Sequence, residues 1–159
     1  MKVIYHCYGG AHSSVTAAAI HLGYLPENRT PSAKEIMQVP LYDKHTDSDH
    51  GKIFLFGIDE HNNEIYVVGC RSLGDTFDSI LRGIGDIAGI DHSDTILVNT
   101  LSAVNWKMRI GGYLSRRLGI IALGRPIVLS GTRSNYQKFV KMVNSVKNHL
   151  YNKSVQGGK

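Results

Sequence analysis

The chain has 159 residues, which is the size of one ordinary domain and is long enough to bury a hydrophobic core. Apolar residues make up 42% and charged residues 19%, with 17 glycines and four prolines, which excludes a disordered, collagen-like or low-complexity chain. The formal net charge is +5. Because two cysteines are too few for a disulfide framework and no apolar run could span a membrane, we expect a cytoplasmic protein.

The charge is distributed unevenly along the sequence. Residues 1–94 hold all 13 acidic residues and seven basic ones, whereas residues 95–159 hold eleven basic residues and no acidic one. A basic surface of this kind attracts an anion such as a phosphate ester, a nucleic acid or an acidic partner. It could equally dock against the acidic half of the same or a neighbouring chain, and the sequence leaves both interpretations open.

The first third of the chain contains one predicted strand and two predicted helices. Residues 2–7 are β-branched and aromatic and predict a strand that ends at Gly9-Gly10. Apolar spacing predicts a helix over residues 13–22. Residues 32–35 have the spacing of a capping box, which predicts the start of a short helix that Pro40 ends.

The middle of the chain predicts a β-hairpin followed by a helix. Two strand-like runs, residues 52–59 and 64–70, flank a polar turn at residues 61–63. Apolar residues then recur at helical spacing over residues 72–88, so we expect an amphipathic helix there despite its glycines.

The last third of the chain alternates between the two kinds of element. We expect strands over residues 95–100 and 126–130, because both are short apolar runs, and helices over residues 105–118 and 134–151.

This alternation indicates the fold class. Strands that alternate with helices form a mainly parallel sheet with right-handed crossovers. We therefore expect a three-layer α/β fold, with helices on both faces of the sheet and one antiparallel hairpin. It would form a single domain over residues 1–153, followed by a flexible tail over residues 154–159.

The loop that follows the first strand is the candidate site, because ligands of open α/β sheets bind at the carboxyl ends of the strands. Its glycines let the backbone N–H groups approach an anion, and the next helix points its positive end at the loop. Cys7 is the candidate nucleophile, because a helix N-terminus stabilises a thiolate. His12 is the candidate proton carrier. The other candidate ligand-binding residues of the loop are Gly9, Gly10, Ala11, Ser13 and Ser14. Cys7 could instead be a buried strand-end residue that only packs.

Two known kinds of loop share this spacing. Cys7, Gly10, Ser13 and Ser14 give a Cys-x-x-Gly-x-x-Ser-Ser pattern that resembles the phosphocysteine loop of the B components of sugar phosphotransferase systems. The loop also resembles the Cys-x5-Arg-Ser loop of low-molecular-weight tyrosine phosphatases and arsenate reductases, but Ser13 stands where their arginine binds the phosphoryl oxygens. The resemblance implies phosphoryl chemistry at Cys7, although the missing arginine argues against a tyrosine-phosphatase mechanism.

Two cations outside the loop are candidates for neutralising a bound anion. Lys107 would begin a helix near the carboxyl edge of the sheet, and Arg133 would follow the last predicted strand, where it could replace the missing loop arginine. Nitrogen and oxygen ligands also gather within six residues of one polar loop, at His45, Asp47, Asp49 and His50. We assign no metal site there, because a flexible polar loop has this composition by chance.

The whole chain also resembles a small uncharacterised family of Gram-positive bacteria, a domain of unknown function. Residues 6–14 and 109–119 carry the resemblance, which implies no activity.

The sequence thus predicts a cytoplasmic protein that binds a small phosphorylated or otherwise anionic ligand, with phosphoryl transfer or hydrolysis through Cys7. The alternatives are a non-catalytic binder of a phosphorylated metabolite or nucleotide and a basic interaction module. Nucleic acid is a less favoured partner, because no recognition motif or aromatic interleaving is present. No membrane partner is expected, self-association stays open, and the sequence names no cofactor.

Overall fold

The computed structural model describes residues 1–157, apart from the side chains of residues 116, 117, 156 and 157. Four strands form one open sheet in the order β2-β3-β1-β4. The central strand β1 (Lys2–Cys7) runs parallel to β3 (Glu64–Gly69) and to β4 (Thr95–Asn99). Strand β2 (Ile53–Ile58) is antiparallel to β3, so the predicted hairpin and the mainly parallel sheet are both confirmed.

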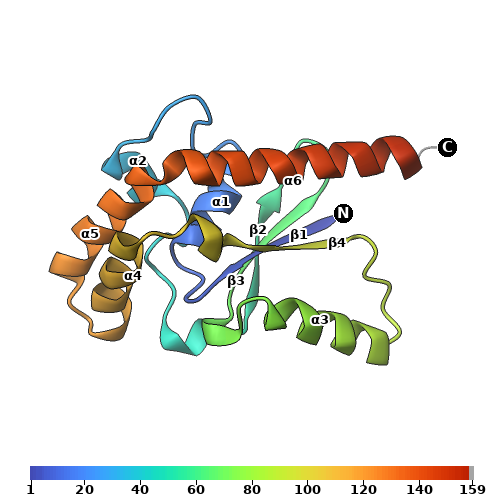
Figure 1. Cartoon of the computed structure of the whole chain (residues 1–159), viewed down its shortest axis with the longest axis horizontal. Helices are drawn as coiled ribbons and strands as arrows, with labels where there is room; N and C mark the ends of the chain where they lie inside the picture. The colour runs from blue at the N-terminus through green and yellow to red at the C-terminus, as the bar shows by residue number, and fades with distance from the viewer. Residues whose placement is uncertain (158–159) are drawn as a thin grey trace.

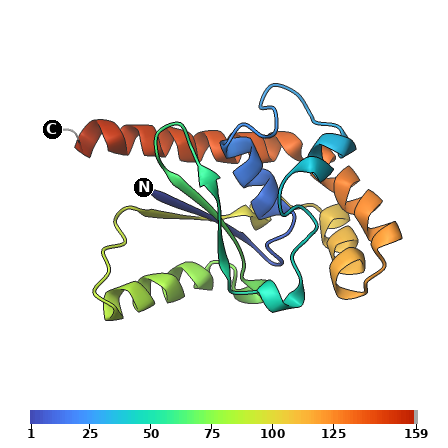
Figure 2. The ribbon, with the colours of Figure 1, turned by 180° about the vertical axis from the view of Figure 1, so that it is seen from behind.

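Helices cover both faces of this sheet, as predicted (Figures 1 and 2). Helices α1 (Ser13–His21) and α6 (Tyr136–Gly157) pack on one face, where Val3 and Tyr5 of β1 enter the main core. Helix α3 (Thr76–Ile87) lies on the other face, where its Phe77 meets Ile4 and Val68 in a smaller cluster. Alternate residues of β1 point to opposite faces, so one strand contributes to both cores.

The order of the strands determines where a ligand would bind. From β1 the chain reaches β3 on one side by way of α1 and the edge strand β2, and from β3 it reaches β4 on the other side by way of α3. The carboxyl end of β1 is therefore the point where the strand order reverses. Ligands of open α/β sheets bind at this position.

Most of the predicted elements occur in the structure with small shifts of their ends. The capping box at residues 32–35 is present, since Ser32 accepts a hydrogen bond from the Glu35 amide and Glu35 accepts one from the Ser32 amide. It begins α2 (Ala33–Gln38). The helix predicted over residues 105–118 occurs as α4 (Trp106–Gly112), which continues as a π-helical segment, Tyr113–Arg117.

The strand predicted over residues 126–130 is wrong, because these residues lie inside helix α5 (Ile121–Ser134). A short apolar run cannot be assigned to strand or helix from periodicity alone. Packing decides the outcome here: Gly111 of α4 and Gly124 of α5 bring the two helix backbones into contact, and a Cβ atom on Gly124 would lie 2.7 Å from the Gly111 carbonyl oxygen. Val128 is buried one turn after Gly124, which is helical spacing.

The C-terminal helix is longer than predicted. Helix α6 continues to Gly157, so residues 154–157 are helical where the sequence predicted part of a tail. The rest of the predicted tail, residues 158–159, lies outside the described residues. Among the helices described in the structure, none is long and apolar enough to cross a membrane.

Candidate functional site

The loop between β1 and α1 is fixed to the end of the neighbouring strand β3. The carbonyl of Cys7 accepts a hydrogen bond from the Cys70 amide at 2.9 Å, and the carbonyl of Tyr8 accepts one from the Arg71 amide at 2.8 Å. Gly10 adopts a positive φ of 67°, a conformation that glycine takes without strain. Residues 7–14, which we call the thiol loop, therefore have a defined shape at the carboxyl edge of the sheet.

The thiol of Cys7 lies inside this loop and accepts a hydrogen bond from it. The backbone N–H of Gly10 donates to the Cys7 Sγ at 3.1 Å, and the Ser14 Oγ lies 3.2 Å from the same sulfur. The residue is 4% exposed. The sulfur of Cys7 is thus held within the loop by a backbone amide and lies next to a hydroxyl group.

The thiol loop leads directly into helix α1. His12 is the N-cap residue, and its side chain makes no capping hydrogen bond to the helix. Ser13 and Ser14 follow, both buried. The Thr100 hydroxyl, just after β4, donates to the His6 carbonyl at 2.9 Å and lies 3.0 Å from the Ser13 Oγ. The end of β4 thus supports the first turn of α1.

The imidazole of His12 is held by a carboxylate that the sequence analysis did not identify. The Nε2 of His12 lies 3.1 Å from Oδ1 of Asp43, which also accepts a hydrogen bond from the Ser115 hydroxyl at 2.9 Å. The Arg125 Nε donates to Oδ2 of Asp43 at 2.7 Å. Burial alone would raise the pKa of Asp43, but the hydrogen bonds from His12, Arg125 and Ser115 hold it well below its ordinary value. Asp43 therefore stays ionised.

Asp43 also contacts the thiol loop through its backbone. Its amide donates to the Ala11 carbonyl at 3.0 Å, and its own φ is positive, at 53°. The sequence offered one weak signal for it, namely a carboxylate that opens a polar loop three residues after the proline that ends a predicted helix. Its partners Ser115 and Arg125 are 72 and 82 residues away, so no local pattern could identify them.

The two cations predicted from the sequence lie away from the thiol loop. Lys107 rests over the ring of Trp106, with its Nζ 5.9 Å from the ring centroid. The Nε of Arg133 donates to the Pro31 carbonyl at 3.0 Å. The structure therefore places Arg125, and neither Lys107 nor Arg133, in the hydrogen-bonded group that includes His12.

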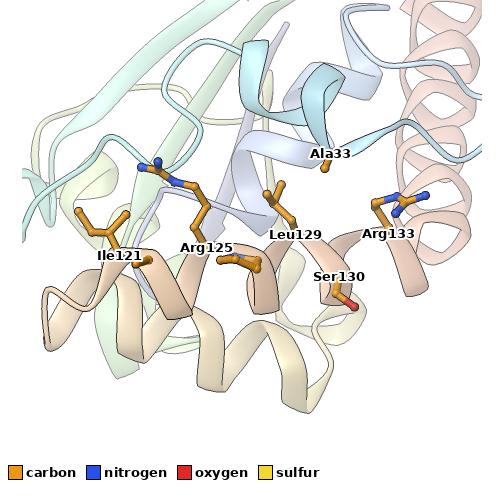
Figure 3. A pocket seen from close by; sticks show the side chains of 8 residues that line it. Ala33, Ile121, Arg125, Leu129, Ser130 and Arg133 are labelled. Atoms are coloured by element: carbon orange, nitrogen blue, oxygen red, sulfur yellow. The ribbon is translucent and has the colours of Figure 1, made fainter.

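Arg125 and Arg133 both line a shallow groove of about 400 Å³ between α2 and α5 (Figure 3). The apolar part of its lining comes from both helices, with Ala33 on α2 and Leu129 on α5. A second groove of about 330 Å³ lies between α4 and α5, and Lys107 lines it. Both grooves are distinct from the thiol loop.

The polar loop with four potential metal ligands is arranged through other contacts. The ring of His45 packs against Phe54, with centroids 4.5 Å apart, and the Nδ1 of His50 lies 3.0 Å from the Asp47 carbonyl oxygen. Within the described part of the chain, no group of three or more histidine, cysteine, aspartate or glutamate residues could hold a metal ion.

Fold and site together define an α/β protein with a mostly parallel open sheet and a cysteine-containing loop at the carboxyl end of its central strand. The chain belongs to the family described as protein of unknown function (DUF3189), whose model matches residues 2–148. The expectation of an uncharacterised family is thereby confirmed. Neither a curated protein nor a solved structure matches the chain significantly.

Proposed function

We propose that the thiol loop binds a phosphate-type anion and that Cys7 acts as a nucleophile in phosphoryl transfer. The observation that carries the proposal is the hydrogen bond from the Gly10 amide to the Cys7 Sγ, with the Ser14 hydroxyl beside the same sulfur. The proposed reaction uses the thiolate of Cys7, because the thiolate is the reactive form of cysteine. The N-terminus of α1 adds a positive partial charge on the same side of the sheet.

The reaction begins when the thiolate of Cys7 attacks the phosphorus of a phosphate ester or an acyl phosphate. A sulfur–phosphorus bond forms as the phosphorus–oxygen bond to the leaving group breaks, and the leaving oxygen takes a proton from the His12 imidazolium or from water. In the second step, water or an acceptor hydroxyl attacks the phosphocysteine. A phosphorus–oxygen bond forms as the sulfur–phosphorus bond breaks, the attacking oxygen gives its proton to His12, and the thiolate of Cys7 is released.

Asp43 supports His12 in this scheme as a positioning residue. A carboxylate next to the Nε2 fixes the orientation of the imidazole ring. Arg125 binds the same carboxylate and adds a cation to this side of the loop. It replaces Lys107 and Arg133 in the proposed site.

A second candidate function is a non-catalytic anion binder, in which Cys7 only packs. The burial of Cys7 favours this candidate, because at 4% exposure the sulfur is covered unless the loop shifts on binding. The loop and its amides would serve the same kind of ligand in both cases. The two candidates differ in the chemistry of the thiol.

The alkylation rate measures how reactive the Cys7 thiol is, and Cys70 is a matched internal control. Cys70 is also 4% exposed, but burial raises the pKa of its thiol. The Cys70 thiol donates a hydrogen bond to the Cys7 carbonyl oxygen, with the sulfur 3.4 Å from that oxygen. With iodoacetamide at pH 7, we expect Cys7 to react at least about tenfold faster than Cys70. The Ser14→Ala variant should slow Cys7 and leave Cys70 unchanged. If both cysteines react at one rate, or only after unfolding, Cys7 is not an activated nucleophile.

Covalent transfer is tested with acetyl phosphate as the donor. Intact-mass measurement should detect phosphorylated wild-type protein and none in the Cys7→Ser variant. That variant should still be stabilised against heat by inorganic phosphate, because a ligand at one hundred times its dissociation constant adds roughly 2.7 kcal/mol to the folded state. Stabilisation without covalent transfer in the wild type supports the non-catalytic binder. A wild type that shows neither effect contradicts both candidates.

A further inference from the structure

Helix α3 leaves much of its apolar side uncovered. Phe77 and Leu81 pack against the sheet, but the isoleucines of the same helix are open to solvent. Ile87 is 91% exposed. We call the exposed residues of this region the α3 surface: Ile80, Ile84, Ile87 and Ile90.

The neighbouring sheet face adds to this surface. Leu55 of the edge strand pairs with Tyr66, and Tyr66 pairs with Ile4, so all three lie on the side of the sheet that faces α3. Leu55 and Ile53 are both exposed. Neighbouring exposed apolar side chains of this kind often mark a surface that binds another molecule.

The segment of the chain that carries α3 has a negative net charge. Residues 71–94 contain five aspartates and only two arginines, which gives a net charge of −3. Asp78 and Asp86 lie on α3 itself, and Asp91 follows Ile90. A partner that covers this surface must present apolar side chains together with positive charge.

The helical hairpin of α4 and α5 presents such a combination. Its two grooves share Pro126 and Ser130, so they flank one exposed ridge of α5, and Trp106 and Ile110 line the groove on the α4 side. Trp106 is 65% exposed. We call this ridge with its two grooves the hairpin surface.

Cations line both grooves of the hairpin surface, and one of them, Arg125, is paired with Asp43. Lys107 lines the groove on the α4 side, and Arg125 and Arg133 line the groove on the α2 side (Figure 3). Residues 105–134 contain six basic residues and no acidic one. The hairpin lies at one end of the molecule and α3 lies under the sheet toward the other end, so one chain cannot bring its own two surfaces together (Figure 1).

We propose that the α3 surface of one copy docks on the hairpin surface of a second copy. The chain itself carries two exposed apolar surfaces of opposite charge, and an amphipathic helix laid into a hydrophobic groove is a common mode of recognition. A symmetric contact between two α3 surfaces would place aspartates against aspartates, and a contact between two hairpin surfaces would place cations against cations. Charge complementarity therefore selects the head-to-tail arrangement, which builds a closed ring or an open chain of copies.

Two variants at exposed positions remove one surface each. Ile84→Lys with Ile87→Lys adds positive charge to the α3 surface, and Trp106→Glu with Ile110→Glu adds negative charge to the hairpin surface. All four side chains are exposed, so the fold should persist. Tyr151→Glu on α6 is the matched control, because it replaces an equally exposed aromatic residue outside both surfaces.

Light scattering after size-exclusion chromatography measures the assembly from micromolar to hundreds of micromolar protein. We expect the wild type and Tyr151→Glu to associate with rising concentration, and each double variant to associate at least about tenfold more weakly. An equimolar mixture of the two double variants should form at least a dimer, because the intact hairpin surface of one variant can pair with the intact α3 surface of the other. This mixing result is specific to head-to-tail docking.

Three outcomes overturn the proposal. The wild type can stay monomeric at every concentration, which leaves both surfaces for other partners. The hairpin variant can associate as strongly as the wild type, which indicates a symmetric α3 contact. The mixture of variants can stay monomeric while the wild type associates, which excludes pairing between these two surfaces.

Discussion

Gly10 and Gly69 bring the thiol loop and the end of β3 into backbone contact. A Cβ atom on Gly10 would lie 2.6 Å from the amide nitrogen of Gly69, and one on Gly69 would lie 2.7 Å from the carbonyl carbon of Gly9. No side chain fits between the two segments. This contact sets the position of the Gly10 amide, which donates to the Cys7 sulfur.

We therefore expect alanine to destabilise the protein at Gly10 and to leave its stability almost unchanged at Gly9. Gly10→Ala introduces both the short contact with Gly69 and an unfavourable positive φ, so it should lower the free energy of unfolding by about 2–4 kcal/mol. Gly9→Ala should change it by no more than about 0.5 kcal/mol, because its Cβ would meet no atom within 4 Å. Urea denaturation measures both. Equal losses in the two variants would show that the loop is shaped by something other than this contact.

Asp43 joins the thiol loop to the α4–α5 hairpin, and its charge can be removed without changing its shape. In Asp43→Asn, the partners His12 and Arg125 lose their carboxylate, so the free energy of unfolding at pH 7 should fall by about 1–3 kcal/mol. Asp47→Asn is the control, because its side chain is 78% exposed and should change stability by less than about 0.5 kcal/mol.

The acid side of the pH profile provides a second measurement on Asp43. Because its pKa is lowered in the folded protein, the stability it contributes is present above the unfolded pKa of about 3.9 and is lost as the pH falls below that value. The Asp43→Asn variant should therefore approach the wild type in stability as the pH is lowered from about 4 toward 2. A constant difference between the two proteins over this range would contradict the assignment.

The two halves of the site differ in how far the sequence could predict them. Strand β1 and helix α1 follow from local patterns, and the position of Cys7 between them follows from topology. Asp43 and Arg125 could not be found in this way, because their pairing depends on how α5 packs. That packing was itself missed, since the run at residues 126–130 has no local feature that separates a strand from a helix, and the helix is selected by contacts with α4.

A buried chain of polar groups connects the far end of α1 to the β2–β3 turn. The Tyr5 hydroxyl lies 2.8 Å from the His21 Nδ1, and the His21 Nε2 lies 3.2 Å from Oδ2 of Asp59. Since the carboxylate only accepts, the Nε2 carries the proton and the Nδ1 accepts from Tyr5. Burial lowers the pKa of His21, although the hydrogen bond to Asp59 raises it in part. His21 is therefore neutral in the folded protein at neutral pH.

This arrangement predicts a loss of stability in mild acid. Below the unfolded pKa of about 6.5, the unfolded chain binds a proton at His21 that the folded protein does not bind, so stability falls by up to about 1.4 kcal/mol per pH unit. Burial lowers the pKa of His6 as well, so both residues contribute to this loss as the pH falls below about 6.5. His21→Asn should be less stable at pH 8 and show a shallower slope. His61→Gln is the control, because His61 is exposed and should keep the wild-type slope. A wild-type slope in His21→Asn would assign the pH dependence to other groups.

Glycines allow the backbones of α4 and α5 to touch where the helices cross, as Gly10 and Gly69 do at the thiol loop. A Cβ atom on Gly111 would meet the backbone nitrogen of Val128 and would lie 2.8 Å from the Gly124 carbonyl oxygen. Gly111→Ala should therefore push the helices apart and lower the free energy of unfolding by about 1–3 kcal/mol. It should also displace Ser115, which donates to Asp43, so the Cys7 alkylation rate should change with it.

Gly83→Ala in α3 is the matched control for this substitution. Gly83 is also helical, but its Cβ would meet no atom within 4 Å, so alanine there should stabilise the protein by about 1 kcal/mol through helix propensity alone. Urea denaturation of the two variants separates propensity from packing, because both replace a helical glycine by the same residue. If Gly111→Ala were as stable as Gly83→Ala, α4 and α5 would not be in backbone contact. Packing against α4 would then not explain why residues 126–130 form a helix.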